Sequence, residues 1–503
     1  MATVVREIER KYDPGAGGAA VLDAVKAMTG TAGVAAVAQE PEQFLDAVYY
    51  DTADLRLIRA GITLRRRTGG EDAGWHLKLP AGADTREEIR LPLAGPGASA
   101  DGAVPDELAA LIRAYTRGAA LAPVVRIETG RRVLRLLDGT GQTLAEIAAD
   151  HVSAGPADGP ANTSWDEIEA ELVTGGPGLL EAVDTRLRQD GARPAAAATK
   201  LQRALAGRLP AAGATQRPRL TAESPAGQVV LAYVRDQVAA ITRYDPLVRR
   251  DEPDAVHQMR VATRRARSVL QAFGTIIDRD AVRPLCVELK WLAAVLGQAR
   301  DTEVLRDRLT ADLAGVPPAL VVGPVEARIT AHFTAELTRA RQAALDALDG
   351  QRYLRLLDDL DALLADPPLT PLAHREAGRV LAKPTAQAAR RLRRALAAVP
   401  GAADRDTAIH QARKAAKRSR YAAEAAVPAL GGTARRQAAQ AKELQQLLGD
   451  HHDGVVARTV LLELAQQARA AGEDTFTYGL MHQRQACQAA RMEQALPRLT
   501  AKI

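Results

Sequence analysis

The chain has 503 residues and carries 67 Lys and Arg side chains against 61 Asp and Glu, for a formal net charge of +6. Hydrophobic residues make up 47% of it, which excludes wholesale disorder, and no run of about 18 uncharged apolar residues predicts a transmembrane helix. No apolar signal-peptide stretch follows the first basic residue, and Cys286 and Cys487 alone cannot build a disulfide framework or a zinc site. We therefore expect a reduced, cytoplasmic protein.

Charge is distributed unevenly along the chain. Residues 1–207 hold 23 basic and 29 acidic side chains, whereas residues 208–503 hold 44 basic and 32 acidic ones. Of those 44 cations 38 are Arg, the side chain best suited to bidentate phosphate recognition. Genomic bias toward Arg codons could explain Arg over Lys, but it does not explain the change of sign between the halves.

In the first 175 residues, turn-forming residues recur at the short intervals that are typical of a β protein. Gly, Pro, Asp and Ser separate short alternating runs, and helical pieces interrupt them near 19–28, 106–115 and 178–189. This spacing predicts an antiparallel sheet or barrel with a few covering helices. The predicted strands are Val4–Lys11, Gln43–Tyr50, Ile62–Arg67, Trp75–Leu79, Glu87–Leu93, Arg131–Leu137, Leu144–Ala149 and Glu167–Val173.

Charged side chains alternate along several of these predicted strands, so each set shares one face of its strand. The acidic sets are Glu7 with Glu9, Glu146 with Asp150, and Glu167 with Glu169 and Glu171. The basic or mixed sets are Lys11 beside Glu9, Arg65 with Arg67, His76 with Lys78, and Arg86 with Glu88 and Arg90. They could be solvated ladders on an outer face. If they lie inside a barrel, a polyphosphate with a divalent metal such as Mg²⁺ or Mn²⁺ would give both signs a partner.

At these residues the chain resembles the CYTH domain of the triphosphate tunnel metalloenzymes. The resemblance rests on EIERK (7–11), YYDTADLRL (49–57), ITLRRR (62–67), HLKLP (76–80), AEIAAD (145–150), EIEAEL (167–172) and TKLQRAL (199–205), in the family's order. It implies an antiparallel eight-stranded β-tunnel over residues 1–205 that binds triphosphate and Mg²⁺ or Mn²⁺.

The resemblance also implies roles for individual residues. As metal ligands it implies Glu7, Glu9, Glu169 and Glu171, with Glu146 and Asp150 nearby. As triphosphate-binding cations it implies Lys11, Arg65, Arg67, Lys78, Arg86 and Lys200, with a further one among Arg126, Arg131 and Arg132. The catalytic set would be Glu7, Glu9, Lys11, Lys78, Glu169 and Glu171.

Residues 206–226, rich in Pro, Gly and Ala, predict a linker, and from about Val229 onward a period of 3.6 predicts some eight to ten helices. This half contains an internal repeat. The segment 255–273 resembles 408–426, and 296–305 resembles 448–457, at offsets of 153 and 152. Two motifs in order at nearly one offset indicate a duplicated unit, with repeats at about 227–375 and 376–503.

The repeated segments carry basic stripes on one face of a helix. His257, Arg260, Arg264 and Arg267 have the spacing +3, +4, +3, and His410, Arg413, Lys417 and Arg420 repeat it. Like charges four residues apart destabilise a helix, so a duplicated stripe favours a polyanionic ligand over a merely solvated face. Lys290, Arg300 and the cluster Arg390, Arg391, Arg393 and Arg394 are weaker candidates.

These segments resemble the paired His–basic helices of the CHAD domain over residues 227–503. That resemblance implies an all-α domain of two four-helix bundles whose basic groove binds inorganic polyphosphate. The chain as a whole would then be an α+β multidomain protein. The repeats differ, since Arg300 corresponds to His452 or a neighbour, so we expect an asymmetric groove.

Together the two halves favour a metal-dependent inorganic triphosphatase that docks on long polyphosphate, with polyphosphate granules as its place in the cytoplasm. A binding protein with an idle tunnel competes with this hypothesis. An adenylate cyclase or thiamine triphosphatase is a further alternative, which the scarcity of aromatic residues (3%) disfavours. Nucleic-acid binding is disfavoured for the same reason, since single-strand binders stack bases on aromatic rings.

Overall fold

The computed structural model describes residues 3–14, 18–82, 85–93, 102–209 and 219–500. The chain divides into two compact units, Met1–Gln216 and Arg217–Ile503. Residues 210–218 of the predicted linker lie outside the described residues. Among the helices that are described, none combines the length and the apolar character needed to cross a membrane.

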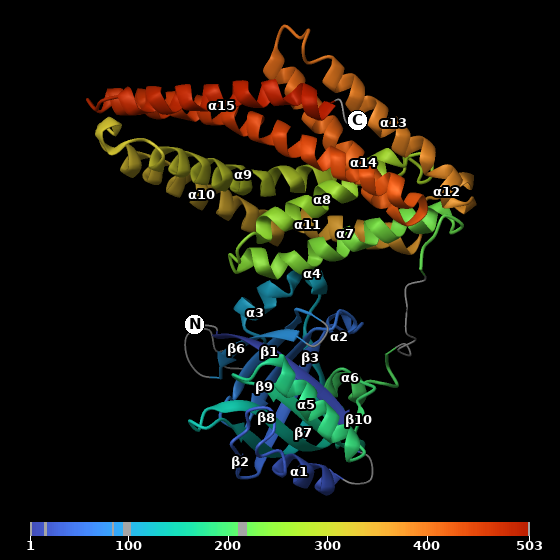
Figure 1. The fold of residues 1–503 in the computed structure, drawn as a ribbon. Helices are drawn as coiled ribbons and strands as arrows, with labels where there is room; N and C mark the ends of the chain where they lie inside the picture. The colour runs from blue at the N-terminus through green and yellow to red at the C-terminus, as the bar shows by residue number, and fades with distance from the viewer. Residues whose placement is uncertain (1–2, 15–17, 83–84, 94–101, 210–218, 501–503) are drawn as a thin grey trace. The chain divides into compact units, whose positions relative to one another are not determined.

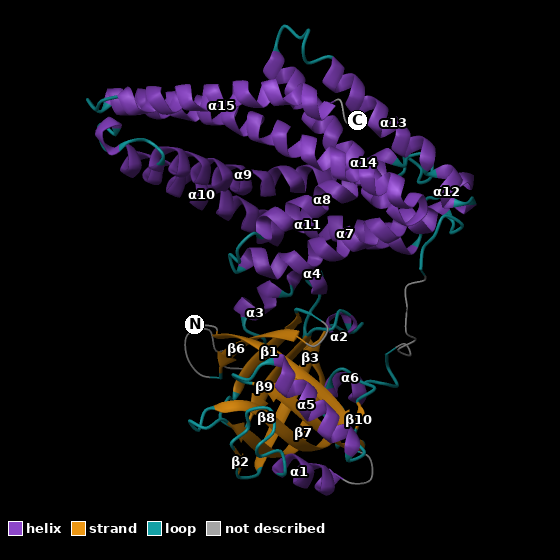
Figure 2. Ribbon diagram, viewed as in Figure 1, coloured by secondary structure: helices purple, strands orange, loops and turns teal. Residues whose placement is uncertain are grey.

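The first unit is a closed antiparallel β-barrel (Figures 1 and 2). Eight strands form the wall in the order β1-β6-β5-β4-β3-β7-β8-β9, and β9 pairs with β1 to close it. Two short strands extend the sheet, β2 beside β7 and β10 beside β1. The strands are β1 (Thr3–Asp13), β2 (Ala36–Gln39), β3 (Gln43–Asp51), β4 (Thr63–Thr68), β5 (Gly74–Pro80), β6 (Thr85–Pro92), β7 (Ala122–Leu137), β8 (Thr143–Gly155), β9 (Thr163–Leu172) and β10 (Arg193–Pro194).

The predicted eight-stranded antiparallel barrel is confirmed, and each predicted strand corresponds to one wall strand. The largest difference is β7, which begins at Ala122 rather than at Arg131. Pro123 and Gly130 are residues that usually mark turns, but pairing with β3 on one side and β8 on the other keeps this stretch extended. Long-range pairing therefore outweighs local preference here.

Helices cover two sides of the barrel wall. Helices α1 (Gly18–Lys26) and α5 (Pro177–Gln189) pack over β7, β8 and β9. On the other side, α2 (Arg56–Arg59), α3 (Asp106–Leu111) and α4 (Arg113–Thr116) pack over β4, β5 and β6. The wall strands thus bury apolar residues outward and keep their charged faces for the interior.

The interior changes character along the barrel. At one end it is filled by apolar side chains, among them Tyr49, Val125 and Trp165, together with Leu201 and Leu205 of and beside α6 (Lys200–Ala204). These strand residues share their faces with the charged residues farther along the same strands. These apolar side chains therefore close one end of a charged cavity. Lys200, the first residue of α6, lines that cavity.

The second unit is all-helical, as predicted. Its helices are α7 (Ala226–Arg249), α8 (Ala255–Ala272), α9 (Arg283–Ala314), α10 (Val325–Asp349), α11 (Gln351–Ala365), α12 (Ala377–Val380), α13 (Ala382–Ala397), α14 (Arg405–Ala470) and α15 (Phe476–Thr500). Helix α14 joins two helices across a kink at Gly431, whose positive φ of 54° favours glycine. Its N-cap, Asp404, accepts a hydrogen bond from the backbone N–H of Thr407. Helices α7, α8, α13 and α14 place both predicted basic stripes within one bundle.

Candidate functional site

A cavity of about 340 Å³, here called the tunnel cavity, lies inside the β-barrel. Most of its lining is charged, with nine cationic and seven acidic side chains among the described residues. The cations are Lys11, Arg65, Arg67, Lys78, Arg86, Arg90, Arg131, Arg135 and Lys200, and the acids are Glu7, Glu9, Glu71, Asp72, Glu146, Glu169 and Glu171. The predicted charged ladders therefore face inward rather than toward solvent.

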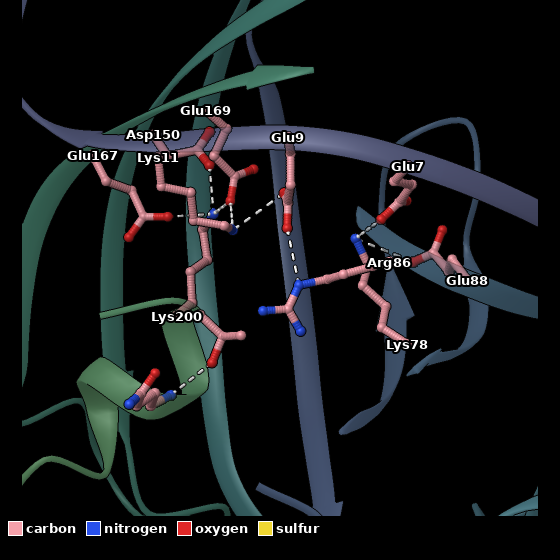
Figure 3. Close-up of polar contacts among 12 residues, drawn as sticks. Glu7, Glu9, Lys11, Lys78, Arg86, Glu88, Asp150, Glu167, Glu169 and Lys200 are labelled. Atoms are coloured by element: carbon pink, nitrogen blue, oxygen red, sulfur yellow. Dashed lines mark hydrogen bonds and ion pairs between the residues drawn. The ribbon is translucent and has the colours of Figure 1, made fainter. Parts of the chain in front are cut away.

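Lys200 is the centre of one charged group (Figure 3). Its ammonium lies 2.9 Å from Asp150, 2.7 Å from Glu167 and 2.6 Å from Glu169. Arg131 adds contacts of 2.6 Å to Asp150 and 2.5 Å to Glu169. Burial alone would raise the pKa of Asp150, but the charges of Arg131 and Lys200 hold it below its usual range. This side of the cavity is thus electrically balanced by the protein itself.

Lys78 is the centre of a second group on the opposite wall (Figure 3). Its ammonium lies 2.5 Å from Glu7 and 3.6 Å from Glu88, a carboxylate with no exposed surface. Burial raises the pKa of Glu7 above its usual value, and the neighbouring Glu88 adds to that shift while Lys78 opposes it. Arg86 contacts Glu9 at 3.4 Å, as does Lys11.

Three carboxylates form a row across three adjacent strands. Glu171 on β9 is directly opposite Glu9 on β1 and, on its other side, directly opposite Glu146 on β8. Like charges in directly opposed positions repel one another. Within the described part of the chain, no basic side chain forms an ion pair with Glu171. Burial, with Glu7 and Glu9 nearby, raises the pKa of Glu171 to about 7.

This row presents three carboxylates, the type of ligand that a hard divalent cation takes. Mg²⁺ and Mn²⁺ prefer oxygen ligands, and a cation beside Glu171 would favour its ionised form, which burial and the nearby Glu7 and Glu9 disfavour. Oxygens of Asp150, Glu167 and Glu169 also lie within 4.8 Å of one another. However, that second group is already paired with Lys11, Arg131 and Lys200, whereas Glu171 has no ion-pair partner among the described residues.

Of the three candidate arginines on β7, Arg131 lines the tunnel cavity and Arg126 does not. Arg126 is 45% exposed at its side chain and pairs with Asp46 at 2.9 Å and Glu128 at 3.3 Å. The strand runs without a bulge between the two residues, so positions five apart face opposite sides of the wall. The sequence prediction of Arg126 as a triphosphate-binding residue is therefore corrected, and Arg132 is exposed as well.

The two arginines should differ in their effect on stability. Arg131→Gln leaves the fully buried Asp150 carboxylate without its bidentate partner, so we expect a loss of about 3 kcal/mol in the free energy of unfolding. Arg126→Gln removes an exposed pair and should leave the thermal midpoint unchanged. Thermal or urea unfolding of both variants measures the difference, and equal midpoints would contradict this placement of the two side chains.

The structure adds Arg90 and Arg135 to the cavity lining, and it pairs the buried Glu88 with two lining residues, all of which the sequence-based assignment left out. Glu88 contacts Arg65 and Lys78 at 3.7 and 3.6 Å, and Arg90 lies 3.3 Å from Glu7. Glu88 and Arg90 could have been predicted from the sequence, because they alternate with Arg86 along one face of the same strand. Arg135, which contacts Glu146 at 3.0 Å, had no such signal among its apolar neighbours. His76 is buried, with its ring nitrogens 3.0 Å from Glu88 and 2.9 Å from the Asp72 carbonyl.

In the helical unit the two predicted stripes meet. We call Arg260 and Arg264 of α8, with Arg413 and Lys417 of α14, the central cluster. Burial, together with the charges of Arg264, Arg413 and Arg260, lowers the pKa of Lys417 to about 6. Burial and the same neighbours also lower the pKa of Arg264. The central cluster is thus a concentration of positive charge that its own carboxylates do not balance.

The duplication is visible in equivalent side-chain pairs. Arg260 contacts Asp301 at 2.8 Å in the first copy, and Arg413 contacts Asp453 at 3.7 Å in the second. Each guanidinium also lies against a glycine, Gly297 in the first copy and Gly449 in the second. These Asp and Gly residues stand at equal places in the repeated segments, so both motifs serve to position the stripe arginines.

The remaining predicted residues of the stripes have different surroundings. Arg420 pairs with Glu424 at 2.7 Å, and Arg300 pairs with Glu303 at 3.1 Å. The rings of His410 and His452 are 4.7 Å apart in the second copy, whereas His257 of the first copy lies near the charge of Arg300, so the two copies differ at this position. Lys290 is exposed on α9 and takes part in none of the ion pairs found among the described residues.

Comparison with known proteins gives matches to both halves. The CYTH domain family matches residues 6–203, and the CHAD domain family matches residues 232–462. Two uncharacterized proteins of Mycobacterium tuberculosis, from strains CDC 1551 and H37Rv, are each 42% identical over 530 residues, which covers 99% of this chain and 96% of theirs. Among solved structures, PptA from Streptomyces chartreusis is 25% identical with a TM-score of 0.48, covering 55% of this chain and 99% of that one. The CHAD domain from Ricinus communis is 26% identical with a TM-score of 0.45, covering 57% and 94%.

Proposed function

Because the chain belongs to the proteins that join a CYTH domain to a CHAD domain, we propose that its barrel hydrolyses inorganic triphosphate with a divalent metal and that its helical unit binds inorganic polyphosphate. The observation that carries the first part is the tunnel cavity, in which nine cations and seven acids face one another. Few ligands other than a metal-bound polyphosphate would suit both sets of charges.

Ligand binding would exchange one set of ion pairs for another. In the ligand-free barrel, Lys11, Lys78 and Lys200 hold carboxylates. Phosphoryl oxygens can take the place of those carboxylates around the ammonium and guanidinium groups, and the released carboxylates can hold the metal. The three ammonium groups therefore keep anionic partners at both stages, which avoids a cost of several kcal/mol per buried charge.

Glu9, Glu146 and Glu171, with Glu7 and Glu169 beside them, would hold the metal. Mg²⁺ or Mn²⁺ bound there would polarise phosphoryl oxygens and lower the pKa of bound water. The chain's own cations do the rest. Lys78 and Arg86 pair with Glu7 and Glu9, whereas Lys11, Arg131 and Lys200 gather around Glu169. Held in fixed positions, they orient the phosphate chain and stabilise the charge that develops during transfer.

The cavity suits inorganic triphosphate better than ATP. Its apolar floor closes one end, and its volume of about 340 Å³ is filled with charged groups. Tyr49 is the one aromatic residue among the described residues of the lining, and its hydroxyl already accepts a hydrogen bond from Arg65 at 3.3 Å. The lining therefore offers no free ring on which adenine could stack.

The helical unit supports the second part of the proposal through its central cluster. Four cations from two helices lie close enough to depress the pKa values of Arg264 and Lys417. A polyanion would relieve this repulsion, and inorganic polyphosphate needs no aromatic platform. We therefore propose polyphosphate as the partner of this unit. We also propose that the protein binds it at polyphosphate granules.

Phosphate release from tripolyphosphate, ATP and long polyphosphate, with Mg²⁺, Mn²⁺ or EDTA, tests the catalytic part. We expect hydrolysis of tripolyphosphate to exceed that of ATP and to stop in EDTA. The Glu7→Ala/Glu9→Ala variant should lose this hydrolysis because two cavity carboxylates are gone. Asp46→Asn/Arg126→Gln, which removes an exposed ion pair on the outer side of the wall, serves as the control and should keep it.

Two results would contradict the proposal. Metal-dependent release that survives the Glu7→Ala/Glu9→Ala change would show that the chemistry does not occur in the tunnel cavity. No release from any of the three substrates, combined with tight retention of long polyphosphate, would identify a binding protein with an idle tunnel.

A further inference from the structure

A second large cavity lies in the helical unit, away from the central cluster. It measures about 1340 Å³ and is bordered by the end of α8, the start of α9, α12, α13 and the middle of α14. We call it the basic cavity, because seven cations and only two acids are found among its described lining residues. The cations are Arg279, Arg283, Arg375, Arg379, Lys383, Arg391 and Arg418, and the acids are Asp280 and Glu376.

Most of these cations lack a carboxylate partner. Glu376 pairs with Arg379 at 2.9 Å. Among the described residues, the other six cations of the lining form no ion pair. Arg267, the last residue of the first stripe, stands beside this group, because Arg418 and Cys286 of the lining both act on its charge. An excess of fixed positive charge repels itself and costs stability unless a ligand neutralises it.

The second repeat has residues at equivalent positions, and there the excess of positive charge is neutralised. Offset by 153 residues, Glu424 corresponds to Gln271 and Tyr421 to Ser268. Glu424 pairs with Arg420 at 2.7 Å and with Arg265 at 3.4 Å, and it accepts a hydrogen bond of 2.9 Å from the Tyr233 hydroxyl.

The first repeat lacks both features. Gln271 carries no charge, Ser268 carries no ring, and both line the basic cavity. Tyr421, the residue equivalent to Ser268, is in contrast only 2% exposed, so its ring is packed inside the second repeat. The place beside Glu424 is therefore packed and neutralised, and the place beside Gln271 is open and cationic.

The shape and chemistry of the basic cavity favour a linear chain of phosphates. Cations come from α8–α9 on one border and from α12, α13 and α14 on the others, so a ligand with many charges can contact several of them. The floor between them is aliphatic, with Leu270, Val282 and Pro384. No Phe, Trp or Tyr belongs to the described lining, so bases of a nucleic acid would find no stacking platform.

We propose that the basic cavity binds a segment of a linear inorganic polyphosphate chain whose neighbouring segment lies on the central cluster, with Arg267 between them. This inference rests on the proposed polyphosphate binding of the helical unit and extends it to one side only. The polyphosphate site is thus longer than the duplicated stripes, and it is asymmetric because the second repeat closes the equivalent place.

Affinity of the full-length chain for long polyphosphate tests this inference. The variant Arg283→Gln/Lys383→Gln/Arg391→Gln removes three exposed cations of the basic cavity and should keep the fold. Its matched control, Arg435→Gln/Arg436→Gln/Lys442→Gln, removes three exposed cations of α14 that do not line it. We expect the Kd of the cavity variant to rise at least tenfold above that of the control, with a shallower dependence on salt.

A single substitution gives a second readout. Gln271→Glu introduces the carboxylate that the second repeat has at Glu424, four residues after Arg267, so it should also weaken binding of long polyphosphate. Equal Kd values for the cavity variant and its control would overturn the inference while leaving polyphosphate binding itself in place. Failure of the unaltered chain to bind long polyphosphate would overturn the proposed function as well. Single-stranded RNA that binds more tightly than polyphosphate at the same salt, and is lost in the cavity variant, would replace polyphosphate as the ligand.

Discussion

Replacing Glu171 by Gln should raise the thermal stability of the metal-free barrel and abolish its metal-dependent phosphate release. The change keeps the shape of the side chain and removes the central charge of the row formed with Glu9 and Glu146. A pKa of about 7 in the folded state, against 4.5 for an ordinary Glu, corresponds to a penalty on the order of 3 kcal/mol for the ionised form. Relief of that penalty should raise the midpoint of the barrel by roughly 6–12 °C.

The gain in stability should depend on pH in a defined direction. Because the folded pKa of Glu171 lies above its unfolded value, its contribution to stability is fully present below about pH 4.5 and is lost as pH rises to about 7. The difference in midpoint between Glu171→Gln and the unaltered chain, measured in EDTA, should therefore be larger at pH 8 than at pH 5. Glu181→Gln, an exposed change on α5, provides the control and should shift neither value.

Activity and metal binding should change in the opposite sense. Loss of a partner outside the ligand shell commonly costs 10- to 100-fold in metal affinity or activity, so loss of a ligand should cost at least about 100-fold. The stabilisation that Mg²⁺ or Mn²⁺ gives to the unaltered chain should also disappear. A variant that keeps both the metal-induced shift and the phosphate release would place the metal elsewhere in the cavity.

Much of the barrel can be predicted because its strands obey a simple alternation. Outward positions such as Leu64, Leu77 and Ile89 are apolar since helices cover them, and inward positions are charged. The first half of β7 could not be predicted, because its extension past Gly130 depends on pairing with β3 and β8. The short strands β2 and β10 could not be predicted for the same reason, since each is extended because it pairs with one neighbouring strand.

The tunnel cavity was predictable to the extent that charges alternate within a single strand. Glu7, Glu9 and Lys11 are two residues apart, so one face holds all three whatever their neighbours are. The choice between Arg126 and Arg131 required the register across Gly130, which only the complete sheet supplies. The row of Glu9, Glu146 and Glu171 also depends on register, because it joins three strands that are far apart in sequence.

In the helical unit, the repeat offset predicted equivalent stripes but not the differences between their surroundings. Helical spacing gives the face on which Arg267 and Arg420 lie. It does not reveal that Glu424 neutralises one of them while Gln271 leaves the other beside Arg418. Comparing the two copies position by position turns such a difference into a structural signal, and the basic cavity follows from it.

Lys417 gives the second large effect, because polyphosphate binding should make this side chain take up a proton. Burial, with Arg264, Arg413 and Arg260 nearby, lowers its pKa to about 6, and Asp453 opposes this shift. The folded pKa lies below the unfolded value of 10.5, so stability of the helical unit is lost as pH falls through that range. A polyanion on the central cluster restores the charged form, and affinity should therefore increase as pH falls toward 6.

Calorimetry in two buffers of different ionisation enthalpy measures this uptake. At pH 7.5 we expect close to one proton bound per site occupied by long polyphosphate, and Lys417→Gln should remove most of it while raising the thermal midpoint of the ligand-free unit. Lys414→Gln, an exposed neighbour on the same helix, loses the same charge and should leave the uptake unchanged. Uptake that persists in Lys417→Gln would assign the proton to His257, His410 or His452, whose pKa values burial also lowers. Polyphosphate would then contact the histidine end of the stripes rather than the central cluster.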